Sequence, residues 1–235
     1  MFISSVYNKD MAIAPYHILY EDDDLLVVYK ERNVFSIRTQ DKKTYSHNLY
    51  HYLYEYLKRK NERPYIVHRL DYETSGIVVF AKNESIQTLL RSAFEKREVK
   101  REYEAVVKES LECGKTYHVE HYLNDKKNPN KVVITNEQDG RLAITDLEVT
   151  NQIQIGSVFH IDIKTGRRNQ IRIAIHSLGF TLLGDKRYSS NEAKRMYLNA
   201  YRLTFPSSLP INQYCFETQP LWLIENKTNF ESIKK

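Results

Sequence analysis

The sequence is poor in the residues that mark several special classes of protein. Its 235 residues include two cysteines, Cys113 and Cys215, with seven glycines, six prolines and one tryptophan. Two cysteines without a CxxC pair cannot form the usual four-ligand zinc site, so we expect no metal. Both suit the reducing cytoplasm, where we expect each to be a small buried hydrophobic residue. Low glycine and proline content indicates a globular chain rather than a low-complexity one.

Long hydrophobic runs are absent as well. No apolar stretch approaches membrane-spanning length. The segment from Met1 to Pro15 lacks the basic residues and the apolar run of a signal peptide. These absences predict a cytoplasmic protein without a membrane partner. The chain is long enough to bury a core, as one large domain or two small ones.

What the sequence does contain is a small excess of positive charge and many tyrosines. There are 35 Lys and Arg against 30 Asp and Glu, a formal net charge of +5, and 18 tyrosines. A charge this small does not establish a polyanionic partner, but the basic residues cluster beside the motifs described below. Tyrosine rings can stack on nucleic-acid bases, although most tyrosines in a globular protein are half-buried in sheets.

Hydrophobic patterning predicts a mixture of strands and helices. Strands are predicted at residues 18–20, 25–30, 65–67, 77–80, 102–107, 142–149, 157–164 and 196–205. Residues 114–139 read as hairpins with a basic tip at 126–131. A helix is predicted within residues 44–60, with Thr44 or Ser46 as its N-cap. Asn169 is expected to cap a short helix that ends at Gly179.

A further helix is predicted from Asn83, its N-cap, to about residue 97. The apolar positions recur at helical spacing, which predicts a single buried face. That face is formed by Ile86, Leu89, Leu90, Ala93 and Phe94.

The stretch from His68 to Gly76 is the most informative in the chain, and it reads HRLDYETSG. Asp71 stands two residues after Arg69, between a basic segment at 58–63 and an apolar run at 77–80. The turn-forming residues before that run predict a loop that feeds a buried strand and holds Asp71 on a rigid support. By local sequence alone, a solvated surface turn is the more ordinary interpretation.

This stretch, with the IVVFAKN that follows it, resembles the HRLDxxTSG signature of the RluA family of RNA pseudouridine synthases. Two further segments support the resemblance. Lys100–Val107 is similar to the family's K-x-Y-x-A-x-V, and residues 165–179 are similar to its TGRTHQIRVH…LG, followed by a GDxxYG-like segment at 184–188. The sequence departs from the family pattern at Tyr29, Glu31, Arg32, Arg168, Asn169, Ala174, Ser189 and Asn199.

The resemblance implies an α+β fold. We expect a long, mixed, mostly antiparallel sheet in two halves, with helices outside and a central cleft. Residues 17–225 would form the catalytic domain, after an irregular lead-in at 1–16 and before a tail at 226–235. Many relatives carry an S4-type RNA-binding domain before this point; we expect none here, and a monomer.

The resemblance also implies a reaction, the conversion of uridine in ribosomal or transfer RNA to pseudouridine without cofactor, nucleotide or metal. Asp71 would be the catalytic carboxylate, Arg172 its ion-pair partner and Tyr103 the residue that stacks on the base. The target uridine must flip out of its stem-loop, and Arg69 would fill the vacated space. The other implied residues are Arg167, Arg168, Lys186 and Arg187 as phosphate contacts, and His68, Thr74 and Gly76 as residues that shape the loop.

Other interpretations stay open from the sequence. Arg172 could contact phosphate, with Arg167 taking its place beside Asp71, and Tyr103 could be a core residue. The whole chain could be a non-catalytic RNA-binding or RNA-chaperone protein on the same scaffold. A hydrolase that uses Asp71 and a histidine is a weaker alternative, because no histidine stands at a spacing that requires a dyad.

Overall fold

Eleven strands and three α-helices make up the fold in a computed structural model that describes residues 15–126, 131–189 and 193–220. The strands are β1 (Tyr16–Glu21), β2 (Leu25–Lys30), β3 (Tyr65–Ile66), β4 (Ser75–Ala81), β5 (Lys100–Val107), β6 (Thr116–Asn124), β7 (Val133–Thr135), β8 (Arg141–Ile153), β9 (Gly156–Ile163), β10 (Leu198–Thr204) and β11 (Cys215–Glu217). The helices are α1 (Leu49–Lys58), α2 (Glu84–Glu95) and α3 (Gln170–Ser177), with a 3-10 turn η1 (Lys42–Thr44). Most of the predicted lead-in, the tip at 127–130 and the predicted tail lie outside the described residues.

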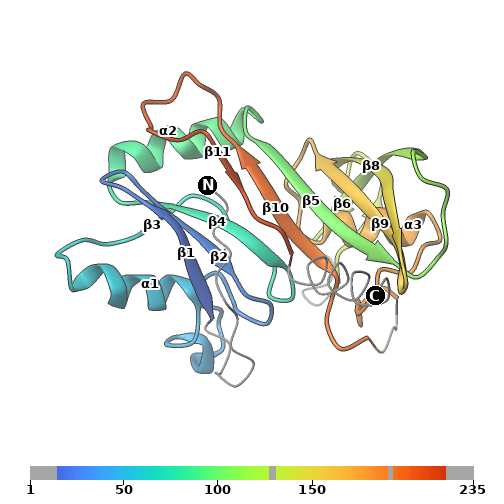
Figure 1. Cartoon of the computed structure of the whole chain (residues 1–235), viewed down its shortest axis with the longest axis horizontal. Helices are drawn as coiled ribbons and strands as arrows, with labels where there is room; N and C mark the ends of the chain where they lie inside the picture. Colours follow the sequence, from blue (N-terminus) through green and yellow to red (C-terminus); the bar gives the residue numbers. More distant parts are fainter. Residues whose placement is uncertain (1–14, 127–130, 190–192, 221–235) are drawn as a thin grey trace, which may run out of the picture.

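All described strands belong to one sheet, in the order β1-β2-β4-β10-β5-β9-β8-β6-β7, with β3 paired to β4 and β11 to β10. Every pair is antiparallel except β4 with β10, which run parallel over two residue pairs, Ser75 with Asn199 and Gly76 with Ala200. This short contact joins the β1-β2-β4 half to the half that begins at β10 (Figure 1). The predicted mixed, mostly antiparallel sheet in two halves is therefore confirmed.

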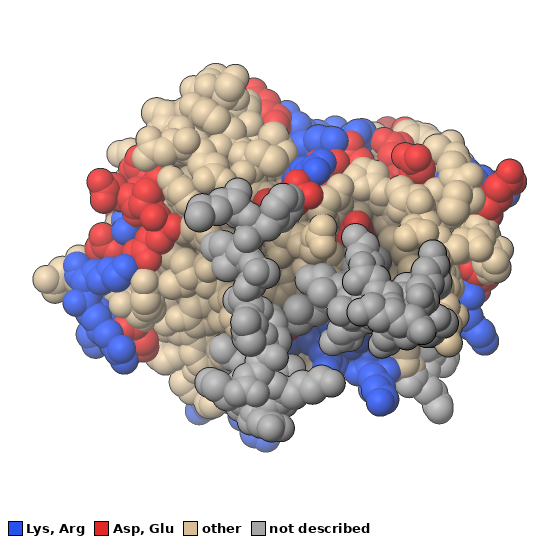
Figure 2. Space-filling view, in the orientation of Figure 1, with Lys and Arg blue, Asp and Glu red and all other residues tan. Residues whose placement is uncertain are grey.

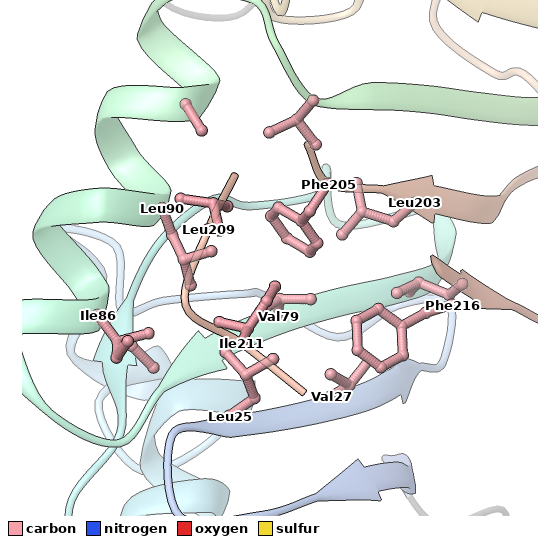
Figure 3. Close-up of a cluster of buried hydrophobic side chains, with 14 residues drawn as sticks. Leu25, Val27, Val79, Ile86, Leu90, Leu203, Phe205, Leu209, Ile211 and Phe216 are labelled. Carbon is pink, nitrogen blue, oxygen red and sulfur yellow. The ribbon is translucent and has the colours of Figure 1, made fainter. Parts of the chain in front are cut away.

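Helices cover both faces of the first half. Leu25 and Val27 of β2 pack with Ile86 and Leu90 of α2 on one face (Figure 3). The alternate residues of β2 pack with α1 on the other face. This arrangement explains why β2 and β4 are buried along their whole length, since side chains point to opposite faces at successive positions of a strand.

In the second half, α3 covers one face of the sheet. Its buried residues Ile171, Ala174 and Ile175 pack with Phe159 and Ile161 of β9. Several residues that alternate with these along β5, β9 and β10 are polar, among them Glu102, His160, Asp162 and Arg202, whereas Val106 and Val158 belong to a smaller buried apolar cluster. The cleft described below lies near the junction of the two halves. None of the described helices combines the length and the apolar content needed to cross a bilayer.

Two predicted helix caps differ in the structure. Helix α1 begins five residues after Thr44, because the side chain of Asn48 accepts the amide of His51 and serves as the N-cap, while Thr44 ends η1. Asn169 precedes α3 but has a left-handed backbone (φ 55°) and makes no side-chain cap bond; its amide instead donates to the Tyr188 hydroxyl. The predicted caps Asn83 and Gly179 are confirmed in position.

Two predictions of burial are wrong. Leu89 lies on the exposed side of α2, with 41% of its surface accessible. Cys113 and Cys215 are exposed free thiols, because one lies in the loop after β5 and the other on β11, which pairs only with β10 among the described strands. An isolated apolar or sulfur-containing residue on a surface is common in folded proteins.

Replacement of Gly76 by alanine should destabilise the protein severely. Gly76 has φ +125°, and an added Cβ would lie 2.3 Å from the carbonyl oxygen of Ala200. The matched control is Gly114→Ala, because Gly114 also has positive φ (+84°) but no atom within 4 Å of the added Cβ. We expect the control to cost about 1–2 kcal/mol in urea unfolding and Gly76→Ala to cost at least about 3 kcal/mol or to prevent folding. Equal costs would contradict the close-approach explanation.

Candidate active site

A cleft of about 650 Å³ contains the three residues predicted to be catalytic. Asp71 lies in its wall on the loop before β4, Tyr103 comes from β5, and Arg172 comes from α3. The register of the sheet relates two of them. Ala200 of β10 is paired with Gly76 on one side and with Tyr103 on the other, so the end of the Asp71 loop and Tyr103 are held two strands apart.

The backbone on both sides of Asp71 is hydrogen-bonded to β2 and to the loop that follows it. The Ser36 hydroxyl donates to the carbonyl of Leu70 (2.8 Å) and lies 3.1 Å from the amide of Leu70, from which it accepts. After Asp71, the Tyr72 carbonyl faces the ammonium of Lys30 at 3.4 Å, and the Thr74 amide donates to the Asp71 carbonyl. These bonds give Asp71 the rigid support that the sequence predicted.

Lys30 is a functional candidate that sequence reasoning missed. Its side chain is fully buried at the end of β2 and also donates to the carbonyls of Glu31 and Val34. Burial lowers the pKa of Lys30 to about 7, against the opposing negative charges of Asp71 and Glu31. The signal that could have identified Lys30 is its position at the end of the strand LLVVYK, in which every preceding residue is apolar or aromatic. A positive charge therefore lies behind the Asp71 loop when Lys30 is protonated.

The predicted ion pair between Asp71 and Arg172 is wrong for this structure. The Arg172 guanidinium bonds to Asp185 in bidentate fashion, with Nε 2.8 Å from Oδ2, and Nη1 lies 2.6 Å from the Glu73 carboxylate. Asp185 is better placed than Asp71 to pair with Arg172. Its side chain is fully buried and also accepts hydrogen bonds from the backbone amides of Arg187 and Tyr188. Arg172 thus reaches the loop through Glu73, two residues after Asp71.

The ionisation of this pair follows from its burial and mutual contact. Burial opposes the charge of Asp185, but the hydrogen bonds and charge of Arg172 outweigh it and lower the pKa of the Asp185 carboxyl. Burial also acts to lower the pKa of Arg172, and the bonds and charges of Asp185 and Glu73 raise it above its ordinary value. Both groups are therefore charged at neutral pH, and the pair forms a fixed support beside the cleft.

Tyr103 faces the cleft from its strand and is half-buried. Burial raises the pKa of its hydroxyl, Arg101 opposes the rise and Asp71 adds to it. The phenol is therefore neutral at physiological pH. Tyr103 also packs against the hydrophobic clusters on both sides of the junction. It therefore serves as a core residue, as considered from the sequence, and also lines the cleft.

The predicted RNA contacts divide between two places. Arg69, Arg167 and Arg168 line the cleft, where Arg69 is exposed and the Arg167 Nε donates to the Leu142 carbonyl. Three arginines that were not predicted as site residues also line it: Arg97, Arg101 and Arg141. Lys186 and Arg187 are exposed but are not among the residues that line the cleft. On the face drawn in Figure 2, lysine and arginine side chains gather in separate patches.

His68 and Thr74 are the other two residues of this segment that were predicted to shape the loop. Thr74 is buried. The His68 Nε2 accepts the amide of Val79 (3.0 Å), and its ring stacks on Phe94 with centroids 4.8 Å apart. Burial and the charge of Arg101 lower the pKa of His68 to about 3, so the ring is neutral. Within the described residues no histidine is hydrogen-bonded to Asp71, which leaves the hydrolase alternative without a dyad.

A metal site is not found in the part of the chain that the structure describes, where no three His, Cys, Asp or Glu side chains are grouped to hold an ion. The side chains that line the cleft include a half-buried carboxylate, a neutral phenol and several guanidinium groups. This set suits an anionic, flat substrate such as a nucleotide.

Comparison with known proteins finds relatives along most of the chain. Residues 24–177 match the family described as RNA pseudouridylate synthase. A ribosomal large subunit pseudouridine synthase D of Vibrio cholerae is 33% identical over 177 residues, which cover 74% of this chain and 53% of that protein. An uncharacterized RNA pseudouridine synthase of Bacillus subtilis is 31% identical over 73% of this chain and 57% of its own length. The chain spans about half the length of these relatives.

Solved structures show the same fold. The human RNA pseudouridylate synthase domain containing 4 superposes with a TM-score of 0.71 at 19% identity, covering 90% of this chain and 91% of that one. The human RNA pseudouridylate synthase domain containing 1 superposes with a TM-score of 0.68 at 22% identity, covering 91% and 86%.

Acid should destabilise the protein through His68. Its folded pKa of about 3 lies below the ordinary value of 6.5, so the unfolded chain binds a proton that the folded protein does not. The stability that the neutral His68 ring contributes to the folded protein is complete above pH 6.5 and is lost as pH falls towards 3. At pH 5 we expect a loss of about 2 kcal/mol from this residue. Urea unfolding at pH 7.5 and 5 should show a smaller acid loss in His68→Gln, which keeps an acceptor, than in wild type or the exposed control His47→Gln.

Loss of the Asp185 carboxylate should be much more costly than loss of the Glu73 carboxylate. Asp185→Asn leaves the Arg172 charge buried without its main partner, for which we expect about 3–5 kcal/mol in urea unfolding. Glu73→Gln keeps an acceptor at a partly exposed position, and we expect about 1 kcal/mol or less. If the two variants were equally stable, Asp185 would not be the principal partner of Arg172.

Proposed function

Because the chain belongs to the RNA pseudouridylate synthase family, the RluA type that its motifs resemble, we propose that it converts specific uridines of structured RNA to pseudouridine. The reaction breaks the C1′–N1 bond, turns the uracil and joins C5 to C1′, with transfer of the C5 proton. Atoms and electrons balance within the nucleotide, so no oxidant or cofactor is needed. The observation that carries the proposal is Asp71, held on a clamped loop in the wall of an arginine-lined cleft.

Asp71 acts at C1′ of a uridine bound in the cleft. In one route its carboxylate oxygen attacks C1′ as N1 leaves, and C5 then displaces the carboxylate. In the other it removes a proton from the ribose and stabilises the positive charge that develops at C1′. Both routes need an ionised carboxylate with oxygens open to the substrate. In support, no hydrogen bond to the Asp71 carboxylate is present within the described residues.

The detached uracil is held between the loop and Tyr103. The phenol ring offers a face for stacking, and its neutral hydroxyl is a candidate to receive or relay the C5 proton. Lys30 and Arg172 do not touch Asp71 in an ion pair, and we assign both a positioning role. Lys30 fixes the backbone at Tyr72, and Arg172 fixes the carboxylate of Glu73.

RNA enters along the cationic residues of the cleft. Flipping the uridine out of its stack costs a few kcal/mol, which Arg69, exposed at the cleft, offsets by filling the vacated space with its planar guanidinium. Arg167 and Arg168 contact phosphates, so binding weakens with salt. Relatives named for the large ribosomal subunit support ribosomal RNA rather than transfer RNA as the proposed substrate, and the proposed location is the cytoplasm.

Replacement of Asp71 by asparagine should abolish the reaction and spare binding. Asparagine keeps the size of the side chain but removes the charge that acts at C1′, so pseudouridine formation should fall by at least about 10³-fold, while RNA affinity stays within about threefold. Chemical mapping of pseudouridine in cells with and without the gene identifies the substrate. The purified variants are then assayed on that RNA.

The matched control is Asp23→Asn, since Asp23 is an exposed aspartate in the turn between β1 and β2. It should retain full activity. Activity of Asp71→Asn comparable to wild type would overturn the assignment of Asp71. If deletion of the gene removes no pseudouridine from any RNA, the non-catalytic RNA-binding alternative replaces the enzyme.

A further inference from the structure

A second pocket, of about 270 Å³, shares the Asp71 loop with the cleft. Asp71 and Thr74 line the cleft, whereas Tyr72 and Glu73 line this pocket, which we call the Tyr72 pocket. Its other walls come from the turn after β2 and from the segment before β10. These residues are Arg32, Asn33, Gly184, Lys186 and 193–196. A ligand seated here contacts the same loop that carries Asp71.

Tyr72 is an aromatic side chain presented to solvent. It is 41% exposed, yet its ring packs on Phe35 with centroids 4.4 Å apart and planes inclined by 34°. Its backbone carbonyl faces the Lys30 ammonium. An aromatic ring that is held by its neighbours while one side stays accessible is a platform on which a base can stack at little entropic cost.

The rim of the Tyr72 pocket is strongly positive. Arg32, Lys186, Lys194 and Arg195 line it, together with one carboxylate, Glu73, which is bonded to Arg172. Both arginines are fixed in place. The Arg32 guanidinium donates to the Lys194 carbonyl (2.9 Å), and Arg195 donates to the Ser75 hydroxyl (3.3 Å). Four cations around a small pocket whose acid is already paired favour an anionic ligand.

We propose that the Tyr72 pocket binds one unpaired nucleotide of the substrate RNA, next to the target uridine. The base stacks on Tyr72 and the phosphate lies among the four cations. The pocket has less than half the volume of the cleft, which suits a single nucleotide rather than a helix. Arg32 stands where the RluA pattern usually has alanine, so this subsite belongs to this chain rather than to the shared motifs. The proposal rests on the proposed function for its substrate.

Fluorescence anisotropy with a labelled single-stranded oligouridine of ten nucleotides tests the subsite. Tyr72→Ala should weaken binding about tenfold, because one stacked base is lost, and Tyr72→Phe, which keeps the ring, should bind within twofold of wild type. The aromatic control is Tyr54→Ala, an exposed tyrosine on α1, which should leave affinity unchanged. Melting curves verify that each variant is folded.

Salt dependence tests the phosphate contact separately. Lys194→Ala should reduce the slope of log K against log salt by about 0.7, the value for one phosphate of a single strand. Lys43→Ala, at an exposed lysine of η1, should not change it. Uridine 5′-monophosphate should bind much more weakly than the oligomer. Equal affinity would assign the pocket to a free nucleotide and overturn the RNA subsite.

The outcomes separate this proposal from the proposed function. Suppose that the wild-type protein forms pseudouridine and that Tyr72→Ala and Lys194→Ala bind the oligomer with wild-type affinity. The subsite is then absent, and the proposed function stands. If wild type forms none but both variants lose affinity as expected, the subsite stands as an RNA-binding site and the catalytic function falls. Failure of wild type to bind the oligomer at all also overturns the subsite.

Discussion

The parallel contact between β4 and β10 is the constraint on which the rest of the molecule depends. It spans only two residue pairs, and at Gly76 the two backbones lie too close for a side chain. The Asp71 loop enters the sheet at this point, and Tyr103 is paired to the same residue of β10, Ala200. One junction therefore joins the halves of the sheet and sets the positions of the carboxylate and the phenol relative to each other.

Two buried basic side chains hold the loop at this junction and leave the proposed catalytic carboxylate of Asp71 unpaired by either of them. Lys30 ends on the Tyr72 carbonyl and Arg172 on the Glu73 carboxylate, so the residues just after Asp71 are both held. Buried charges are costly, and each here is offset by several hydrogen bonds. The same loop turns Tyr72 outward to the second pocket. The same short segment thus forms part of the proposed reaction site and of the proposed nucleotide subsite.

Much of the fold was predictable because its signals are local. The apolar run of β4, the cap at Asn83 and the turn at Gly179 each depend on neighbours within a few residues. The errors involve partners far along the chain. Asn169 was expected to cap α3, but its side chain donates a hydrogen bond to the Tyr188 hydroxyl instead. Leu89 was likewise expected to be buried from its helical spacing, but it lies on the exposed side of α2.

The sequence by itself determined the family, the alternation of strands and helices, and the rigid loop around Asp71, because each is written in contiguous residues. Only the tertiary structure decided which charges meet. Several carboxylates could pair with Arg172. Asp185 is favoured over Asp71 because it is buried, binds the guanidinium in bidentate fashion and accepts hydrogen bonds from two backbone amides. Burial of Lys30 and exposure of Tyr72 were decided in the same way, since both depend on packing between segments more than 30 residues apart.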